Sequence, residues 1–298
     1  MGPRSNWNDA LASLAFHPPG ARSPSEEDIV HHRPSFKAAL LAGAAALALP
    51  SAGCSPARPQ SAEGVVKKMS DRLASAQSFS FTTQEKHQRR RSGAVVEIAR
   101  SRTFTVKRPD AIAFKTVGGE MGGGLGVYDG KSFTMVWPDQ KAYARVKMPA
   151  TIDAALDRVA EHFNIPLPVG DLLYASAYDA LVSPDTTGRY VGREKLGAIE
   201  CDHVAFTQER VDWELWVAVA GDPTPCRLTI TSKGKSGALT SDVTFSDWNL
   251  AAAAPANAFE VNVPQDYERI PVASYEPAQA TPASAPAAAA SSAPPAKP

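Results

Sequence analysis

The chain has 298 residues, of which 44% are hydrophobic and 25 are prolines. A chain of this length can bury a substantial core, but alanine- and proline-rich stretches at both ends predict that only part of it folds, as one domain. Lys and Arg together number 31, as do Asp and Glu. This balance excludes the strongly basic surface that nucleic-acid binding needs, so we expect no nucleic-acid partner.

An export signal is predicted within residues 1–53. Lys37 precedes the apolar run 38–49, and small residues follow it. This order is typical of a secretory signal, and the run is shorter than the roughly 20 residues that a membrane-spanning helix needs. The polar residues 1–29 fit such a signal poorly, and translation beginning near Val30 would remove most of them. We expect the mature protein in the periplasm.

Cys54 follows the signal in the sequence SAGC, which resembles the bacterial lipobox. In that motif, small residues precede a cysteine that receives a diacylglyceryl group, which together with a further acyl chain anchors a protein firmly. Ser51 stands where the motif prefers leucine, so ordinary signal-peptidase cleavage after Gly53 stays open as the alternative. Lipidation of Cys54 would tether the protein to a membrane through the proline-rich residues 54–60, and without it the protein would be free.

The first half of the mature chain predicts a helix followed by strands. Residues 61–73 place Val65, Met69 and Leu73 on one helical stripe, and Ser61 is positioned to cap the helix. From residue 79 the hydrophobic period changes to two, and short turns between strands indicate an antiparallel meander. The predicted strands are 79–84, 94–106, 111–117, 132–137 and 141–147, with a turn at 89–93.

The second half repeats this pattern. A helix is predicted at 151–163 with Thr151 as its N-cap, and a second, short helix within 171–181. Strands follow at 189–194, 201–209, 211–219, 226–233 and 241–250. Residues 276–298 lack large apolar side chains, and the tail 273–298 is expected to be disordered, which leaves 61–272 as the folded domain.

One face of the predicted sheet is apolar. Trp213 and Leu215 point one way from their strand, whereas Asp212 and Glu214 point the other way. Because the same alternation recurs in other strands, a curved sheet would present a continuous apolar concave face that the helices must cover. Either side chains seal this face as an ordinary core, or it leaves a cavity for a ligand. The candidate cavity residues are Phe114, Phe133, Met135, Trp137, Trp213, Leu215 and Val217 on strands, and Leu156, Val159 and Phe163 on the covering helix.

Motifs for catalysis and metal binding are incomplete. Residues 130–132 read GKS, but a phosphate-binding loop would need glycine where Leu125 stands. The sequence GKSGA has Ala238 where a nucleophile elbow needs glycine. The glycine-rich residues 118–126 precede no helix that could bind an anion, so we expect a flexible hairpin loop there. Since no CxxC or HExxH spacing occurs either, we expect no enzyme, no metal and no cofactor.

Cys201 and Cys226 are the other two cysteines. In a meander, the strand 211–219 lies between the strands that carry them. Their Cα atoms would then be about 10 Å apart, beyond the roughly 7 Å limit for a disulfide, unless the sheet is distorted. We therefore expect two free, buried thiols, although export to an oxidising compartment favours a bridge.

Three segments carry a resemblance to a known family. YDGK at 128–131, LPVGDLLY at 167–174, and DHVAF followed by DWELW within 202–216 resemble an uncharacterised bacterial family of predicted periplasmic proteins. That family is similar in fold to the lipoprotein carriers LolA and LolB and to the lipid-sensing domain of the periplasmic sigma-E regulator. The resemblance implies an α+β fold, in which one curved antiparallel sheet forms an incomplete β-barrel covered by about three helices. It also implies an apolar cavity able to hold acyl chains.

These observations predict a non-enzymatic envelope protein, monomeric, that binds a lipid, an acyl chain or a lipidated peptide in the half-barrel. The alternative is an envelope scaffold or stress-sensor domain that binds a protein partner and has a sealed core without a ligand.

Overall fold

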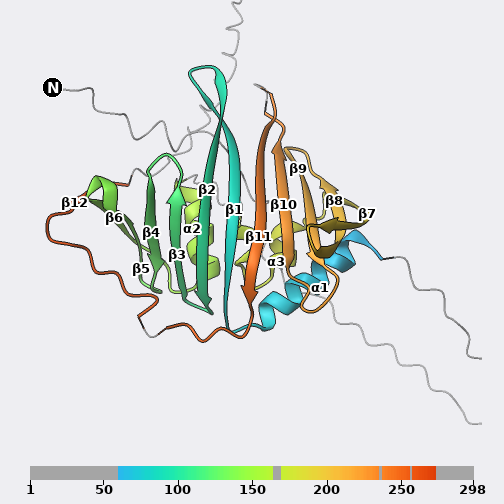
Figure 1. Ribbon diagram of the computed structural model, residues 1–298, viewed down its shortest axis with the longest axis horizontal. Helices are drawn as coiled ribbons and strands as arrows, with labels where there is room; N and C mark the ends of the chain where they lie inside the picture. The colour runs from blue at the N-terminus through green and yellow to red at the C-terminus, as the bar shows by residue number, and fades with distance from the viewer. Residues whose placement is uncertain (1–59, 164–168, 235–236, 256, 273–298) are drawn as a thin grey trace, which may run out of the picture.

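The computed structural model describes residues 60–163, 169–234, 237–255 and 257–272, without the side chains of 161–163. The expected signal peptide, Cys54, most of the tether and the expected disordered tail lie outside these residues. Within them, one open, curved sheet of twelve strands is covered on one side by helices (Figure 1). The fold class expected from the sequence is confirmed.

The sheet consists of two antiparallel meanders that meet at its centre. The strand order is β12-β6-β5-β4-β3-β2-β1-β11-β10-β9-β8-β7, and β1 pairs with β11 to join the two halves. Every pair is antiparallel except β12 with β6. The strands are β1 (Ser78–Arg91), β2 (Ala94–Lys107), β3 (Ala111–Gly118), β4 (Gly123–Tyr128), β5 (Ser132–Trp137), β6 (Ala142–Lys147), β7 (Thr187–Leu196), β8 (Ile199–Thr207), β9 (Val211–Ala218), β10 (Pro225–Ser232), β11 (Leu239–Asn249) and β12 (Glu268–Arg269).

Three α-helices lie on the concave side: α1 (Ala62–Ser75), α2 (Ile152–Phe163) and α3 (Ala177–Leu181). Both predicted N-caps are confirmed. The Ser61 side chain accepts a hydrogen bond from the Gly64 N–H at 3.0 Å, and Thr151 Oγ1 accepts one from the Ala154 N–H at 3.3 Å. In the described part of the chain, no helix has the length and apolar character needed to cross a membrane.

The short helix expected within 171–181 is divided into a 3₁₀ turn, η3 (Gly170–Leu172), and α3. The Arg108 guanidinium donates to the carbonyl oxygens of Leu173 and Tyr174, at 3.0 Å each. A continuous helix would use these carbonyls for its own backbone hydrogen bonds. Ser176 then caps α3 as a new helix, because its side chain accepts from the Asp179 N–H at 3.2 Å. The predicted short helix is therefore present, but it covers only Ala177–Leu181 and not the whole of 171–181.

The glycine-rich segment 118–126 is only partly a loop, because Gly123–Tyr128 forms strand β4 between β3 and β5. Gly126 is needed there: a Cβ atom at this position would lie 2.3 Å from Cζ of the Phe114 ring. Strand pairing on both edges holds β4 in the sheet despite the low strand propensity of glycine. The expectation of a flexible loop across the whole segment is therefore wrong.

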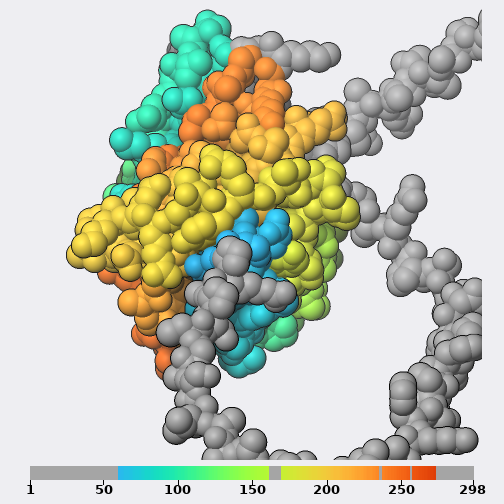
Figure 2. Space-filling model, turned by 90° about the vertical axis from the view of Figure 1, so that its right-hand side faces the viewer, coloured from blue at the N-terminus to red at the C-terminus, as the bar shows by residue number. Residues whose placement is uncertain are grey.

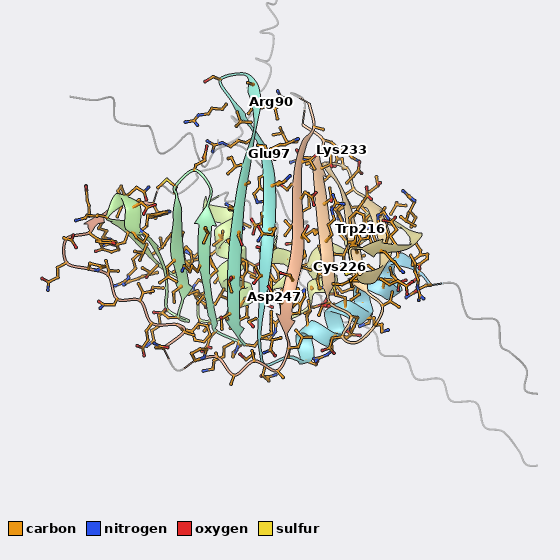
Figure 3. All side chains as sticks on the ribbon, viewed as in Figure 1. Arg90, Glu97, Trp216, Cys226, Lys233 and Asp247 are labelled. Carbon is orange, nitrogen blue, oxygen red and sulfur yellow. A yellow bond between two sulfur atoms is a disulfide. The ribbon has the colours of Figure 1, made fainter. Side chains whose placement is uncertain are left out.

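A disulfide joins Cys201 on β8 to Cys226 on β10, with the two Cα atoms 7.0 Å apart. The expectation of free thiols is wrong, although β9 does lie between the two strands. The pairing of β10 with β9 shifts register between Pro225 and Arg227, which takes Cys226 out of the regular ladder. Cys201 faces Ala218, so only a small side chain lies between the cysteines. The bond packs with Trp216 on the face away from the helices (Figure 3).

Candidate functional site: the concave face of the sheet

The concave face carries one continuous hydrophobic core between the sheet and the helices. Its centre is aromatic, with Phe79, Phe81 and Phe104 at most 2% exposed and the rings of Phe81 and Phe104 stacked 4.7 Å apart. The predicted candidate residues all lie on strands or helices that border this core, but they separate into two groups with different burial.

The first group lies beneath α1. Trp213, Leu215 and Val217 on β9 are 4%, 0% and 2% exposed. α1 packs closely on β7, β8 and β9, and Figure 2 shows this helix, in blue, seated against the yellow segment that includes β7. Val66 and Met69 of α1 are fully buried. Side chains of this chain therefore seal this half of the concave face.

The second group lies on the other half of the sheet and is only half-buried. It consists of Phe114 on β3 and of Phe133, Met135 and Trp137 on β5, which we call the half-buried strip. Met135 is opposite Gly126, and Gly126 is opposite Phe114, so these side chains share one face of the sheet. The Phe114 and Phe133 rings lie 6.1 Å apart. Because the β4 residue between Phe114 and Met135 is Gly126, no side chain of β4 stands between these two side chains.

Helix α2 lies on this half of the concave side, behind β2 and β3 in Figure 1, and is attached mainly at its N-terminal end. The Ile152 side chain is 1% exposed, and its N–H donates to the Pro109 carbonyl at 2.8 Å. Leu156, one turn further, is 9% exposed, whereas Val159 is only half-buried. The side chain of Phe163 lies outside the described part. The burial of α2 therefore decreases from its N-terminus toward its C-terminus.

A buried ionic cluster lies on the same face, beside the strip, and sequence reasoning missed it. Glu85 on β1 is 1% exposed, and its carboxylate accepts two hydrogen bonds from Arg102 on β2, at 2.8 and 2.6 Å. It also accepts one from Arg100 Nε at 2.8 Å and one from Thr83 Oγ1 at 2.8 Å, and it lies 2.8 Å from His87 Nε2. We call Glu85, His87, Arg100 and Arg102 the ionic cluster.

The cluster's electrostatics follow from burial and from its excess of positive charge. Burial alone would raise the pKa of Glu85, but the hydrogen bond from His87 and the charges of Arg102 and Arg100 hold that pKa far below its usual range. Burial is the main cause that lowers the pKa of His87, and together with the charges of Arg100 and Arg102 it outweighs the hydrogen bond and charge of Glu85, which raise that pKa. Burial and the charge of Arg102 also lower the pKa of Arg100. The carboxylate is thus ionised and the imidazole neutral at pH 7.

Arg102 connects the ionic cluster to the half-buried strip. Its guanidinium carbon lies 5.3 Å from the centre of the Phe104 ring and 5.5 Å from the centre of the Phe114 ring. A cation at this distance from an aromatic face is held by the ring quadrupole. A charged region and an apolar region therefore adjoin on the concave side of β1 to β5.

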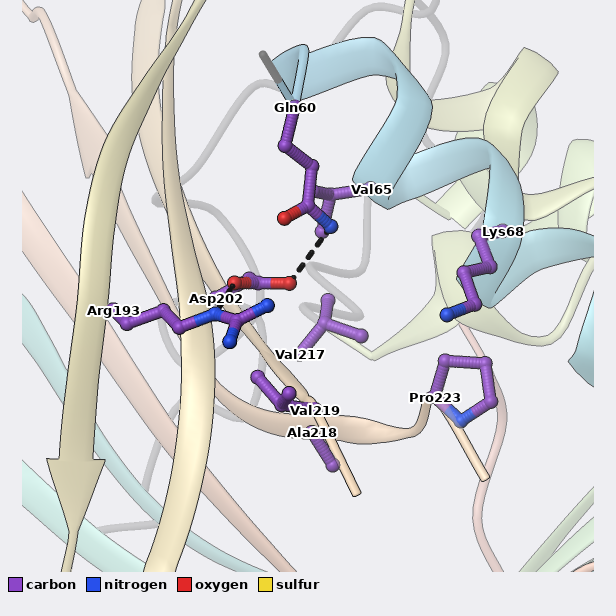
Figure 4. A pocket seen from close by; sticks show the side chains of 9 residues that line it. All are labelled: Gln60, Val65, Lys68, Arg193, Asp202, Val217, Ala218, Val219 and Pro223. Atoms are coloured by element: carbon purple, nitrogen blue, oxygen red, sulfur yellow. Dashed lines mark hydrogen bonds and ion pairs between the residues drawn. The ribbon is translucent and has the colours of Figure 1, made fainter. Parts of the chain in front are cut away.

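Two hollows lie outside the half-buried strip. One, of about 120 Å³, lies between the start of α1 and the end of β9, where Gln60 and Arg193 point toward Asp202 (Figure 4). Asp202 accepts hydrogen bonds from Gln60 at 2.8 Å, Arg193 at 2.9 Å and the Tyr190 hydroxyl at 2.8 Å. The other, of about 570 Å³, is lined in part by Arg227 and Asp242, which form an ion pair, and also by Glu85 and Arg100 of the ionic cluster. Within the described residues, no group of three His, Cys, Asp or Glu side chains could hold a metal ion.

None of the curated proteins matches this chain. Its fold is similar to that of the lipoprotein LppX from Mycobacterium tuberculosis, with 13% sequence identity, a TM-score of 0.40, and coverage of 68% of this chain and 98% of that one. It is also similar to a LolA superfamily protein from Nitrosomonas europaea, with 14% identity, a TM-score of 0.35, and coverage of 67% and 98%. A third similar structure is an uncharacterised conserved protein from Thermus thermophilus, with 12% identity, a TM-score of 0.42, and coverage of 70% and 98%. The resemblance seen in the sequence is confirmed, because the family model for predicted periplasmic proteins matches residues 62–273, and the chain therefore belongs to the DUF2092 family.

Proposed function

We propose that this periplasmic protein is a non-enzymatic binding protein that holds an apolar ligand between the half-buried strip and α2. One observation carries the proposal: four large apolar side chains cluster on one face of β3 and β5, on either side of the glycine-rich β4, and none of them is fully buried. Apolar surface gathered in one place is a usual mark of a binding site, whereas scattered exposure is not. The ligand class is a lipid, an acyl chain or a lipidated peptide.

Binding would proceed by movement of α2 and without bond chemistry. The buried Ile152 and its hydrogen bond to Pro109 fix the N-terminal end of the helix. The turn that carries Val159 is held less tightly, so it can swing away and expose Phe133 and Met135. An acyl chain that buries a dozen methylenes there would gain on the order of 8 kcal/mol before entropy losses, which is enough for useful affinity. The strip itself carries no titratable side chain.

The competing hypothesis is a scaffold or sensor with a permanently filled interior and a protein partner. The sealed half under α1 fits that hypothesis as well as ours, because Trp213 and Leu215 leave no room there. The two hypotheses differ at the strip. A permanent core gives no reason for Phe114, Phe133, Met135 and Trp137 all to remain half-buried.

Displacement of an environment-sensitive apolar fluorophore by palmitate tests the proposal. Phe133→Ser puts a hydroxyl into the strip and should weaken palmitate binding at least about tenfold, since it removes an aromatic contact from the site. Val117→Ser is the matched control: Val117 lies on β3, is 60% exposed, and points away from Phe114's face. It should leave binding unchanged. Equal binding by both variants, or no binding by the unmodified chain, would contradict the proposal.

A further inference from the structure

We propose that the ionic cluster receives the charged head of the ligand, which makes the ligand an anionic amphiphile with a carboxylate or phosphate head. This inference rests on the proposed function and adds the ligand's chemical class. Two features of the cluster carry it: the side chains that the structure describes do not balance its charge, and it adjoins the half-buried strip.

The charge imbalance follows from the side chains and their neighbours. Arg100 and Arg102 contribute two positive charges, Glu85 contributes one negative charge, and burial keeps His87 neutral. Burying a cation without a counter-charge is costly, so a cluster serving stability alone would be expected to pair its charges. A bound anion would supply the missing negative charge.

The residues that the neighbouring strands place opposite the cluster on the concave face add no carboxylate: Asp242 of β11 pairs with Arg227 instead, and Glu120 pairs with Arg89 and Arg91. Glu85 is opposite Val243 on β11, and Arg102 is opposite Thr116 on β3. Arg100 is opposite Gly118, which has no side chain at all. The neighbouring side chains in the ladder therefore leave the positive charge uncompensated.

The most accessible residue of the cluster is Arg100. Arg102 is 4% exposed and both of its bonding nitrogens point at Glu85, but the Arg100 side chain is 27% exposed. Arg100 donates from Nε to Glu85, and its Nη2 lies 3.1 Å from His87. A guanidinium has five N–H donors in a planar fork that suits carboxylate and phosphate oxygens. Arg100 is thus the residue that an incoming head group would meet.

The ionic cluster and the half-buried strip are close enough for one amphiphile to contact both. Arg102 stacks on Phe114 at 5.5 Å, and Phe114 lies 6.1 Å from Phe133. An amphiphile with its head at Arg100 and Arg102 would place its first methylenes over Phe114 and the rest over Phe133 and Met135. The order of charge, aromatic rings and thioether along the concave face matches the order of head and chain in such a molecule.

The test compares matched ligand pairs on the full chain after removal of copurifying lipid, by fluorophore displacement at pH 8. The first pair is palmitate and hexadecanol, and the second is lysophosphatidylglycerol and monopalmitoylglycerol. In at least one pair the anionic member should bind about tenfold more tightly, which corresponds to a hydrogen bond to a charged group. A preference in the first pair alone identifies a fatty acid, one in the second alone identifies a phospholipid, and both support an anionic head.

Variants separate the cluster from other charges. Arg100→Gln should remove the preference for the anionic member, and Arg100→Lys should retain most of it. Arg227→Gln is the matched control, because Arg227 also pairs with a carboxylate on a central strand but stacks on Trp216 on the opposite face. It should keep the full preference. Thermal unfolding of each variant confirms that it is folded.

Equal affinity within both pairs would overturn the inference while leaving the proposed function intact. A preference that survives unchanged in Arg100→Gln would also overturn it, since the charge would then be recognised elsewhere. Failure of all four ligands to bind would contradict the proposed function itself.

Discussion

Arg102 donates two hydrogen bonds to Glu85 on the concave face of the sheet, and neither residue is more than 4% exposed. The pair lies on the same face as the aromatic core, where the strand pattern would otherwise place apolar side chains. Because Arg102 lies beside the Phe114 ring, this ion pair adjoins the half-buried strip in which we propose that the ligand binds.

Glu85→Gln should strongly destabilise the protein. The substitution leaves the buried Arg102 and the partly exposed Arg100 without their counter-charge, and breaking a buried ion pair such as Glu85–Arg102 costs about 3 to 5 kcal/mol. Asp242→Asn is the control, because the Arg227–Asp242 pair has side chains 36% and 32% exposed and should cost about 1 kcal/mol or less. Urea unfolding of both variants measures the difference. Similar decreases in the free energy of unfolding for the two variants would contradict the claim that Glu85 compensates buried charge.

Asp171→Asn should change how stability depends on pH. Burial raises the pKa of the Asp171 carboxyl to about 7, from 3.8 in an unfolded chain. The folded state therefore holds a proton between these values that the unfolded state has lost, and stability falls as the pH rises through this window. Asparagine cannot ionise, so the variant should gain stability relative to the original chain at pH 8 but little at pH 4. The exposed Asp139→Asn serves as the control; a gain independent of pH would contradict the assignment.

Removal of the disulfide should lower stability. Cys201 and Cys226 are 25 residues apart in sequence, and closing a loop of this length contributes about 3 kcal/mol in the chain-entropy model. The double variant Cys201→Ser, Cys226→Ser should unfold at a correspondingly lower urea concentration. Thiol titration of the denatured, unreduced chain should find no more than the one thiol of Cys54. Three reactive thiols would refute the bridge.

Gly126→Ala should displace the Phe114 ring and so disturb the half-buried strip. The added Cβ would lie 2.3 Å from the Phe114 ring, so the ring must move, and overpacking of this kind costs about 1 to 3 kcal/mol. Palmitate affinity should fall together with stability. In Gly234→Ala the nearest atom lies 3.5 Å from the added Cβ, which makes this the matched control. Unchanged binding by Gly126→Ala would show that the Phe114 ring does not contribute to the site.

The architecture was predictable because local patterns determine it. Alternation in residues 211–219 correctly assigned Trp213, Leu215 and Val217 to the core face, and Ser61 and Thr151 marked the starts of two helices. These features depend on residues adjacent in sequence. Consecutive strands that are joined by short turns pair with each other, so the strand order within each meander can be predicted once the strands are known.

The ionic cluster was not predictable in the same way. The sequence predicted a strand over 79–84 and a turn at 89–93, and assigned no strand to the residues between them. In the fold, Glu85 and His87 continue the alternation of Phe79 and Phe81 onto the concave face. Only partners from β2 make a carboxylate acceptable there, and that pairing is not local.

Three further differences also arise from contacts distant in sequence. Arg108 divides the helix expected within 171–181, and pairing with β3 and β5 turns a glycine-rich segment into β4. The register shift before Arg227 brings Cys226 within reach of Cys201. A single sequence offers no direct signal for any of these, although the alternating polar positions in β1 and β2 could have suggested the ionic cluster.

Native mass spectrometry of the protein purified from its own host tests the central claim most directly. The account predicts a population with the added mass of one lipid or acyl-chain ligand, which organic extraction removes and palmitate restores in the original chain but not in Phe133→Ser. A single mass without adduct, together with no thermal stabilisation by any of the four amphiphiles, would contradict the claim that the strip and α2 form a ligand site.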